Sequence, residues 1–317
     1  MTADSILKGM SGRMTEHKKV LLDTDIGTDI DDAVALAYLL RQPQCELMGI
    51  TTVSGEPQAR AMLASCLCRA AGRADIPIYP GSRGPFIGTQ LQPLAQQAEV
   101  LSRFDHQTVF PEAQHIGFMI DTIRRHPGEI SLLAVGPMTN IALLFAADPE
   151  IPGLLKELVL MCGVFGNGIA GLPRAEWNAR VDPVAAAMVY AARPARHRSV
   201  GLDVTCQVKM PAAEVRERFR QDILQTVLAM AEVWFQKRDL ITFHDPLAAV
   251  SLFDEGICRF ETGTADVELY SRRAAGATYW TRGDDGPHQA AFHVDRDAFF
   301  QRYFEVFAGG EGASCRR

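Results

Sequence analysis

A strongly acidic turn follows the first apolar segment of the chain. The segment KKVLLDTD has the pattern of a buried strand, and LLDTDIGTDIDDAVAL then continues into a helical pattern. Within ten residues this turn places five aspartates: Asp23, Asp25, Asp29, Asp31 and Asp32. In a doubly wound α/β fold such a turn lies at the carboxyl edge of the sheet, where ligands bind. Because carboxylates gathered there repel one another, the turn predicts a bound cation.

The ligand type narrows the choice of cation. Hard oxygen ligands favour Ca²⁺ or Mg²⁺ over softer metals. A simpler interpretation is that some of these acids cap the following helix and interact with its dipole, which Asp29 and Asp31 could do. A single capping acid suffices, however, and the surplus would destabilise a metal-free fold. We therefore interpret the whole cluster as a metal site, with Gly27 supplying a turn conformation that a Cβ would hinder.

The rest of the chain indicates the fold class. From Lys18 onward, short apolar segments alternate with longer segments of helical period. This alternation predicts a doubly wound α/β fold, with a mostly parallel central sheet and helices on both faces. The expected strands are KKVLLDTD, CELMGITTV, IPIYPG, ISLLAVG, KELVLMCG and RSVGLDVT. The expected helices begin near Asp31, Pro57, Gln114, Pro137, Asp182 and Pro211.

The order of elements changes after Gln221. A long helical stretch, ILQTVLAMAEVWFQKRDL, precedes β-rich segments around ICRFETGTADVEL and GATYWTRG, and a last helix is expected near RDAFFQRYFEVF. We expect this part to be an appendage on the same core. The predicted organisation is a flexible tail at residues 1–17, a single domain at 18–308 and a second flexible tail at 309–317.

Composition limits the possible partners and the compartment. The net charge of −6 argues against nucleic acid and acidic membrane surfaces as partners. The seven cysteines are scattered and include no CxxC pair, which fits a reducing cytoplasm. No segment has the roughly 18 unbroken apolar residues that a membrane span needs. We expect a soluble, cytoplasmic protein.

The acidic turn resembles the amino-terminal signature of the inosine-uridine nucleoside hydrolases, DxDxGxDD, with two extra residues before the paired acids. The resemblance implies a nucleoside hydrolase-like fold and calcium-dependent hydrolysis of ribonucleosides, as in nucleoside catabolism and salvage. Aligned from both ends, it implies that Asp25 is a calcium ligand and the general base, that Asp31 binds ribose, and that Asp32 is a second calcium ligand. It also leads us to expect a homo-oligomer, either a dimer or a tetramer.

Two distant segments extend the resemblance. AVGPMTNIALL is similar to the family's V-G-P-L-T-N segment, which implies that the backbone carbonyl of Val135 is a calcium ligand. CGVFGNGIAGLPRAEWNARVDP is similar to the segment with the family's E-F-N pair, which implies that Glu176 and Asn178 grip the ribose hydroxyls and that Asn167 is a further ribose contact. An extended backbone would point Glu176 and Asn178 the same way. The alternative interpretation is a solvated loop.

A last match, Phe243-His244-Asp245-Pro246, opens a predicted helix. Taken alone, an Asp before Pro at this place most often caps a helix. The resemblance implies instead that Asp245 completes the calcium shell and that His244, with an ordinary pKa near 6.5, stands near the leaving base as a candidate general acid. Upstream, Trp234 would either stack on the base or belong to the helix core.

One departure and two rival functions stay open. Where many family members have Asn after V-x-G, this chain reads TTVSGEPQ, so Glu56 either contacts the substrate or faces outward at a helix start. A haloacid-dehalogenase-type phosphatase would explain the D-T-D strand end, but Gly27 stands where that family wants Thr or Val. A nucleoside- or ribose-binding protein without turnover is the other rival. The four matches together favour the hydrolase, with the preferred base undetermined.

Overall fold

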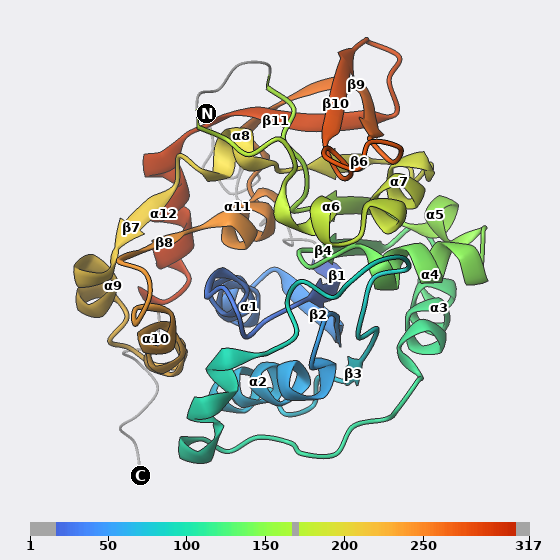
Figure 1. The fold of residues 1–317 in the computed structure, drawn as a ribbon. Helices are drawn as coiled ribbons and strands as arrows, with labels where there is room; N and C mark the ends of the chain where they lie inside the picture. Colours follow the sequence, from blue (N-terminus) through green and yellow to red (C-terminus); the bar gives the residue numbers. More distant parts are fainter. Residues whose placement is uncertain (1–16, 167–170, 309–317) are drawn as a thin grey trace, which may run out of the picture.

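The computed structural model describes residues 17–166 and 171–308, and over these residues the chain forms a mixed nine-stranded sheet (Figure 1). The strand order is β10-β9-β11-β6-β5-β4-β1-β2-β3. The strands are β1 (Lys18–Thr24), β2 (Cys45–Thr52), β3 (Ile78–Pro80), β4 (Ile130–Ala134), β5 (Glu157–Leu160), β6 (His197–Ser199), β9 (Cys258–Val267), β10 (Thr278–Arg282) and β11 (His288–Val294). All neighbours from β3 to β11 pair in parallel, whereas β9 runs antiparallel to both β10 and β11. The predicted mostly parallel α/β fold is confirmed.

Helices cover both faces of the sheet, in two separate apolar cores. One core contains Val20 and Leu22 of β1, and the other contains Leu21, because successive side chains of a strand point to opposite faces. The first core includes residues of α1 (Asp31–Arg41), α2 (Pro57–Ala70), α10 (Ile223–Trp234), α11 (His244–Ser251) and α12 (Arg296–Glu305). The second includes residues of α3 (His115–Arg125), α4 (Thr139–Ala147), α5 (Ile151–Leu154) and α7 (Pro183–Ala191). In Figure 1, α3 and α4 lie on the right of the sheet and α12 on the left.

Shorter elements complete the described chain. They are η3 (Gln96–Arg103), α6 (Trp177–Val181), α8 (Leu202–Thr205), α9 (Ala212–Arg218), η4 (Glu255–Ile257) and a separate antiparallel pair of β7 (Lys209–Pro211) and β8 (Leu240–Thr242). No helix in the described ranges is both long and apolar enough to cross a bilayer.

The strand order creates a crevice beside β1. From β1 the chain continues to β2 and β3 on one side, and later to β4, β5 and β6 on the other. The connections that leave β1 and β4 therefore diverge, which opens a ligand site at their carboxyl ends. Asp23 of β1 pairs with Ala134 of β4, so Asp25 and Val135 follow directly beyond this pair. The topology thus brings two distant sequence motifs to one place.

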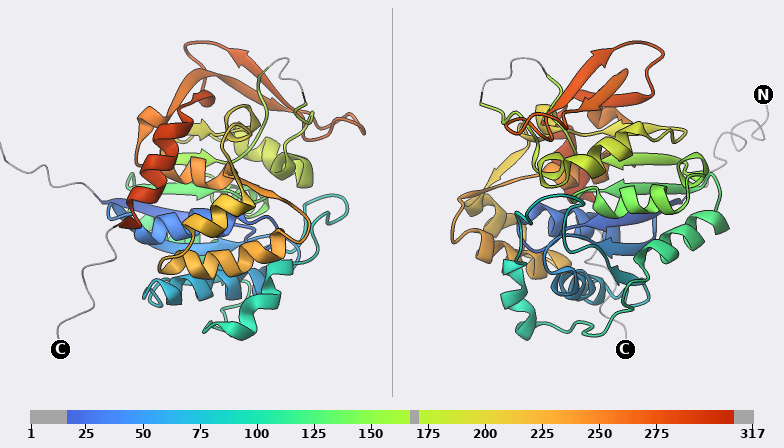
Figure 2. Two further views of the ribbon diagram at one scale, coloured as in Figure 1. Left: turned by 90° about the vertical axis from the view of Figure 1, so that its left-hand side faces the viewer. Right: turned by 45° about the vertical axis from the view of Figure 1, so that its right-hand side comes forward.

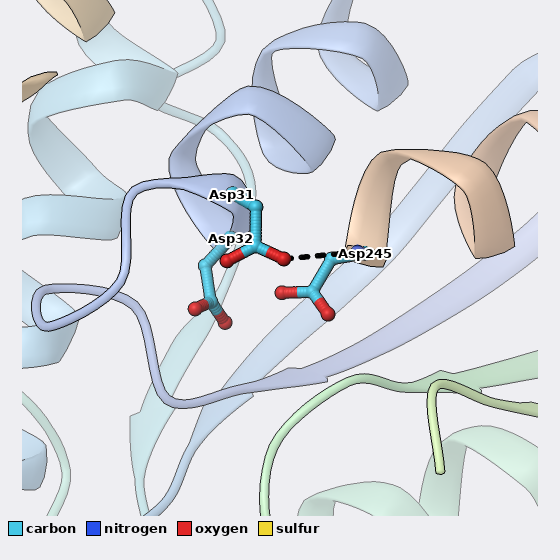
Figure 3. A group of neighbouring side chains, drawn as sticks. All are labelled: Asp31, Asp32 and Asp245. Atoms are coloured by element: carbon cyan, nitrogen blue, oxygen red, sulfur yellow. Dashed lines mark hydrogen bonds between the residues drawn. The ribbon is translucent and has the colours of Figure 1, made fainter. Parts of the chain in front are cut away.

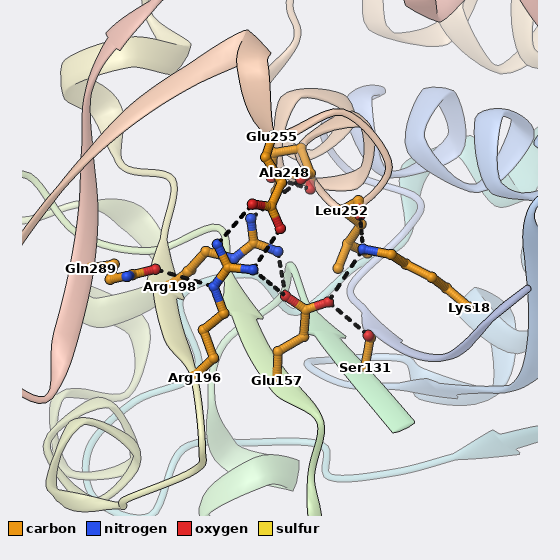
Figure 4. A network of polar contacts seen from close by, with 10 residues as sticks. Lys18, Ser131, Glu157, Arg196, Arg198, Ala248, Leu252, Glu255 and Gln289 are labelled. Atoms are coloured by element: carbon orange, nitrogen blue, oxygen red, sulfur yellow. Dashed lines mark hydrogen bonds and ion pairs between the residues drawn. The ribbon is translucent and has the colours of Figure 1, made fainter. Parts of the chain in front are cut away.

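The amino-terminal ends of the central strands, opposite the crevice, carry a network of paired charges (Figure 4). Glu157, at the start of β5, accepts hydrogen bonds from Arg198 of β6 and, at 2.8 Å, from Ser131 Oγ of β4. The Nζ of Lys18 in β1 lies 3.8 Å from the same carboxylate. The ion pair between Glu157 and Arg198 joins the central strands near their starts. Because Arg198 is fully buried, no water could solvate its charge if the pair were broken.

Three sequence expectations differ from the structure. The expected strand RSVGLDVT ends at Ser199, and Leu202–Thr205 form helix α8 instead. The long helix expected from Ile223 to Leu240 ends at Trp234, and Leu240 instead begins strand β8. The expected appendage is an extension of the main sheet: both views of Figure 2 show β9, β10 and β11, in orange and red, at the end of the molecule opposite α2. Strand β11 was not predicted.

Candidate active site

Three buried aspartates meet where two helices begin (Figure 3). Asp31 and Asp32 lie in the first turn of α1, and Asp245 lies in the first turn of α11. Each offers a carboxylate oxygen within 4.8 Å of the others, and each is at most 4% exposed. The backbone N–H of Asp245 donates to Asp31 Oδ2 at 3.1 Å. This hydrogen bond joins the starts of α1 and α11, although Asp31 and Asp245 are 214 positions apart in the sequence.

The electrostatics of this group favour a cation. Burial, followed by the charges of neighbouring aspartates, raises the pKa of Asp31, Asp32 and Asp245 well above the ordinary carboxyl value. The helix starts compensate part of the negative charge, because N-terminal N–H groups favour anions. An oxygen-only group of this density fits a divalent hard cation such as Ca²⁺ or Mg²⁺. The three carboxylates could therefore hold a metal ion.

The aspartates open into a cavity of about 410 Å³. It unites sequence-predicted residues from five separate segments: Asp25, Asp31, Asp32, Val135, Glu176, Asn178, Trp234, His244 and Asp245. Asp29 also lines it, as do Gln92, Trp177, Arg180 and Arg238, which the sequence interpretation did not single out. The predicted ribose contact Asn167 and the two predicted tails, except His17, lie outside the described residues.

A buried arginine, Arg60, donates hydrogen bonds to the backbone of the acidic turn. Arg60 of α2 is fully buried and donates to the backbone carbonyls of Asp25 and, at 3.0 Å, Ile26, while its Nε donates to Ser54 O at 2.7 Å. Gly27 adopts a φ of +120°, which confirms the predicted turn role of this glycine. Arg60 thus supplies the positive charge that partly offsets the aspartates, although nothing local in its helix pattern distinguishes it.

Asp23 lies behind the cavity and joins β1 to its neighbours. Its Oδ1 accepts hydrogen bonds from Thr51 Oγ1 and, at 2.7 Å, from Asn140 Nδ2. The same Asn140 amide donates to Thr52 O at 3.1 Å. Burial raises the pKa of Asp23 to about 7. Asp23 and Asn140 therefore fix the relative positions of β1, β2 and α4 behind the cavity.

The sequence interpretation expected Glu176 and Asn178 on an extended segment, but in the structure they lie at the start of a helix. Glu176 caps helix α6, and its carboxylate accepts from the backbone N–H groups of Asn178 at 2.7 Å and Ala179 at 3.1 Å. Asn178 lies in the first turn, and its Nδ2 donates to Val135 O at 2.6 Å and Met161 O at 3.0 Å. A capping acid favours a helix start over an extended chain. Burial raises the pKa of Glu176 to about 7.

His244 forms part of the cavity wall near Asp245. Its Nδ1 lies 2.7 Å from Thr205 Oγ1. Burial, with a smaller contribution from Lys209, lowers the pKa of His244 to about 4. The sequence expectation of an ordinary pKa near 6.5 is therefore wrong, since burial disfavours the charged ring. The imidazole is neutral at pH 7.

Two further predicted residues have clear surroundings. Trp234 lines the cavity, and its Nε1 donates to Leu240 O at 2.9 Å, with the Arg238 guanidinium 5.4 Å from the ring centre. Glu56 is not among the residues that line the cavity. Its Oε2 accepts from the backbone N–H of Ala95 at 2.9 Å. Of the two alternatives for Glu56, the structure thus favours an anchoring position at the start of α2 over a substrate contact.

Comparison with known proteins agrees with this geometry. A family model described as inosine-uridine preferring nucleoside hydrolase matches residues 20–301. The chain is 32% identical, over 93% of its length and 99% of the relative's, to the non-specific ribonucleoside hydrolase RihC of Salmonella typhi. It is 28% identical to uridine nucleosidase 1 of Arabidopsis thaliana, over 80% of this chain and 79% of the relative. The solved structure of a plant nucleoside hydrolase, PpNRh1, superposes with a TM-score of 0.77 at 25% identity, covering 92% of this chain and 99% of that one.

Proposed function

Since the chain belongs to the inosine-uridine preferring nucleoside hydrolase family, we propose that it hydrolyses the N-glycosidic bond of ribonucleosides to free base and ribose. The observation that carries the proposal is the convergence of Asp31, Asp32 and Asp245 in a cavity that Asp25 and His244 also line. A cavity of about 410 Å³ is within the range of small-molecule sites. The family membership makes this chain an enzyme, and the cavity supplies the groups for its chemistry.

We propose Ca²⁺ as the cofactor, held by Asp32 and Asp245 of the buried group together with Asp25 and the backbone carbonyl of Val135, whereas the third member of the group, Asp31, binds ribose. The oxygen-only donor set supports this choice over softer metals. Val135 O accepts a hydrogen bond from Asn178, but a carbonyl has a second lone pair that can serve a metal. When bound, the ion would orient a water molecule and the 2′- and 3′-hydroxyls of ribose, so ribose should be preferred over deoxyribose.

In the proposed reaction Asp25 acts as the general base. Asp25 is 5% exposed, and its carboxylate accepts the proton of the attacking water. Asp31, Glu176 and Asn178 hold the ribose hydroxyls and thereby orient C1′ toward that water. The transition state carries positive charge on the ribose ring, and carboxylates arranged beforehand around the ring stabilise it.

His244 serves the departing base in this proposal. With Nδ1 engaged by Thr205, Nε2 is the ring nitrogen that can meet a leaving group. Because the imidazole is neutral at pH 7, His244 donates an N–H hydrogen bond to the base as the bond to ribose breaks. The indole of Trp234 offers an adjacent face against which a planar base can stack.

The test is ribose release from a panel of ribonucleosides that includes uridine and inosine, with 2′-deoxyuridine as the matched poor substrate. Asp25→Asn should lower kcat by at least about 100-fold, the scale of a lost general base. The control is Asp105→Asn, an exposed aspartate paired with Arg69, which should retain activity. If no ribonucleoside is cleaved while calorimetry still detects Ca²⁺ binding, the proposal is wrong and the cavity belongs to a binding protein.

A further inference from the structure

Gln92 connects the cavity to the loop of residues 81–95, which joins β3 to η3. Its side chain is only 6% exposed, although both ends of the amide are polar. Nε2 donates to Asp25 Oδ2 at 2.9 Å, and Oε1 accepts from Trp177 Nε1 at 2.7 Å. One amide therefore spans the distance between the proposed base and a tryptophan that lines the cavity and is 43% exposed.

The orientation of this amide follows from its partners. An indole N–H only donates, so Oε1 must face Trp177 and the NH₂ group must face the carboxylate. In the flipped orientation Nε2 would meet the indole donor and Oε1 would meet Asp25, and both contacts would be repulsive. Trp177 thus selects the orientation in which Gln92 donates to Asp25.

The loop that carries Gln92 is held at both ends. Backbone hydrogen bonds of 2.7 Å join residues 54–55 to residues 82–83 at its start. At its end, Ala95 N donates to Glu56 Oε2 at 2.9 Å. Glu56, which departs from the family pattern, thereby anchors the loop that brings an amide to Asp25.

The backbone of Gln92 is also closely packed. A Cβ at Gly55 would lie 2.3 Å from the backbone O of Gln92, and Gly55 has a φ of +58°. The position therefore requires glycine, both for its conformation and for the close approach. The backbone of Gln92 therefore packs directly against Gly55.

The Asp25 carboxylate contacts the protein on two sides. On one side, Gln92 is the one side chain among the described residues that donates a hydrogen bond to this carboxylate. On another side, Gly136 approaches so closely that a Cβ there would lie 3.0 Å from Asp25 Oδ1. A carboxylate confined in this way keeps one oxygen on Gln92 and cannot turn freely about its Cβ–Cγ bond.

We infer that Gln92 is a positioning residue for the reaction of Asp25, a role that rests on the proposed function. The Gln92 amide, oriented by Trp177, fixes the plane of the Asp25 carboxylate so that its basic oxygen meets the attacking water. A general base must lie within hydrogen-bond reach of the proton that it removes, and loss of this orientation lowers the rate of the chemical step.

The test compares Gln92→Leu, which keeps the side-chain volume but removes both hydrogen bonds, with the wild type. We expect kcat to fall by about 10- to 100-fold, the usual effect of removing such a supporting hydrogen bond, with KM for uridine changed by less than about threefold. Trp177→Phe should lower kcat by about 3- to 10-fold, because the amide can then flip. In the Gln92→Leu background, Trp177→Phe should cause no further loss of kcat.

Two controls separate this role from simple folding effects. Gln96→Leu changes an exposed glutamine just beyond the same loop and should leave kcat unaltered. In ¹⁵N-tryptophan-labelled protein, the three indole N–H signals report structure without activity, and Gln92→Leu should shift the Trp177 signal alone. Thermal denaturation should give Gln92→Leu a melting temperature close to that of the wild type.

The possible outcomes are distinguishable. A kcat within about twofold of wild type in Gln92→Leu, or a further loss of kcat from Trp177→Phe in that background, overturns the positioning role while leaving the hydrolase intact. A fall in kcat that accompanies an equal loss of folded protein also overturns it. A wild type that cleaves no ribonucleoside overturns the proposed function, and the positioning role with it.

Discussion

Removing one charge from the acidic cluster should stabilise the metal-free protein. Asp245 is the clearest choice, because its carboxylate has no resolved hydrogen bond within the described residues. Two carboxylates no more than 4.8 Å apart repel by at least about 3.5 kcal/mol at an effective dielectric constant of about 20. Proton uptake relieves part of this repulsion, and the new amide costs free energy on burial. We therefore expect Asp245→Asn to raise the free energy of unfolding without metal by about 1–3 kcal/mol.

The assay is thermal denaturation in chelator and in increasing Ca²⁺. Without metal, the melting temperature of Asp245→Asn should exceed that of the wild type by about 2–6 °C. Calcium at 100 times its dissociation constant should stabilise the wild type by about 2.7 kcal/mol, and it should have little effect on Asp245→Asn. The exposed Asp105→Asn variant is the control and should follow the wild type. A less stable Asp245→Asn protein in chelator, with the calcium shift retained, would refute the electrostatic reasoning.

Three further predictions concern the scaffold. Glu157→Gln should cost about 3–5 kcal/mol of stability in urea unfolding, because it leaves the buried Arg198 unpaired, whereas replacing both residues by Met should restore most of the loss. Burial and the neighbouring buried His288 lower the pKa of His197, so the folded protein holds this ring neutral. The stability that the neutral ring contributes is complete above pH 6.5 and is lost as the pH falls below 6.5, where the unfolded chain takes up a proton. His197→Phe should therefore make the urea midpoint depend less on pH in this range. Gly136→Ala should cost about 1–3 kcal/mol and reduce ribose release, because the Cβ would lie 3.0 Å from the proposed base, whereas Gly153→Ala, which has open space, should do neither.

The fold was predictable because its signals are local. Strands β1, β2, β4 and β5 are buried apolar segments, and the helices after the first three begin at Asp31, Pro57 and Thr139, which the sequence displays directly. The strand prediction was wrong at Leu202–Thr205, where Val and Thr favour a strand but the chain forms helix α8. There the Asp203 carboxylate accepts N–H bonds from Phe165 at 2.7 Å and from Gly166, and these distant contacts favour the short helix. Propensity is a weak guide when tertiary contacts oppose it.

The candidate site was predictable where its residues cluster in sequence or match a motif. Asp31 and Asp32 are adjacent, and Asp245 lies in a recognisable His-Asp-Pro segment. Gln92 gave no such signal, because it lies in an irregular loop and meets Asp25 only after folding, 67 positions away. Arg60 was missed for the same reason, since its carbonyl partners in the acidic turn lie 34 and 35 positions earlier. Supporting contacts of this kind come from the three-dimensional fold.

The pKa of His244 illustrates a second limit of sequence reasoning. The sequence supplies the ordinary pKa of an imidazole, but the degree of burial decides the shift, and burial depends on the packing of α11 against the rest of the cavity. The same applies to Glu176, whose capping role could not be read from its spacing to Asn178.

In the proposed function, the buried aspartates hold a cation that supports ribonucleoside hydrolysis. The most direct test titrates Ca²⁺ into metal-free protein and follows, on the same sample, calorimetric binding and ribose release from uridine and inosine. We predict one bound Ca²⁺ per chain, with the rate of ribose release rising in proportion to occupancy. Full activity in the metal-free protein, or saturated Ca²⁺ binding without any ribose release, would contradict the account.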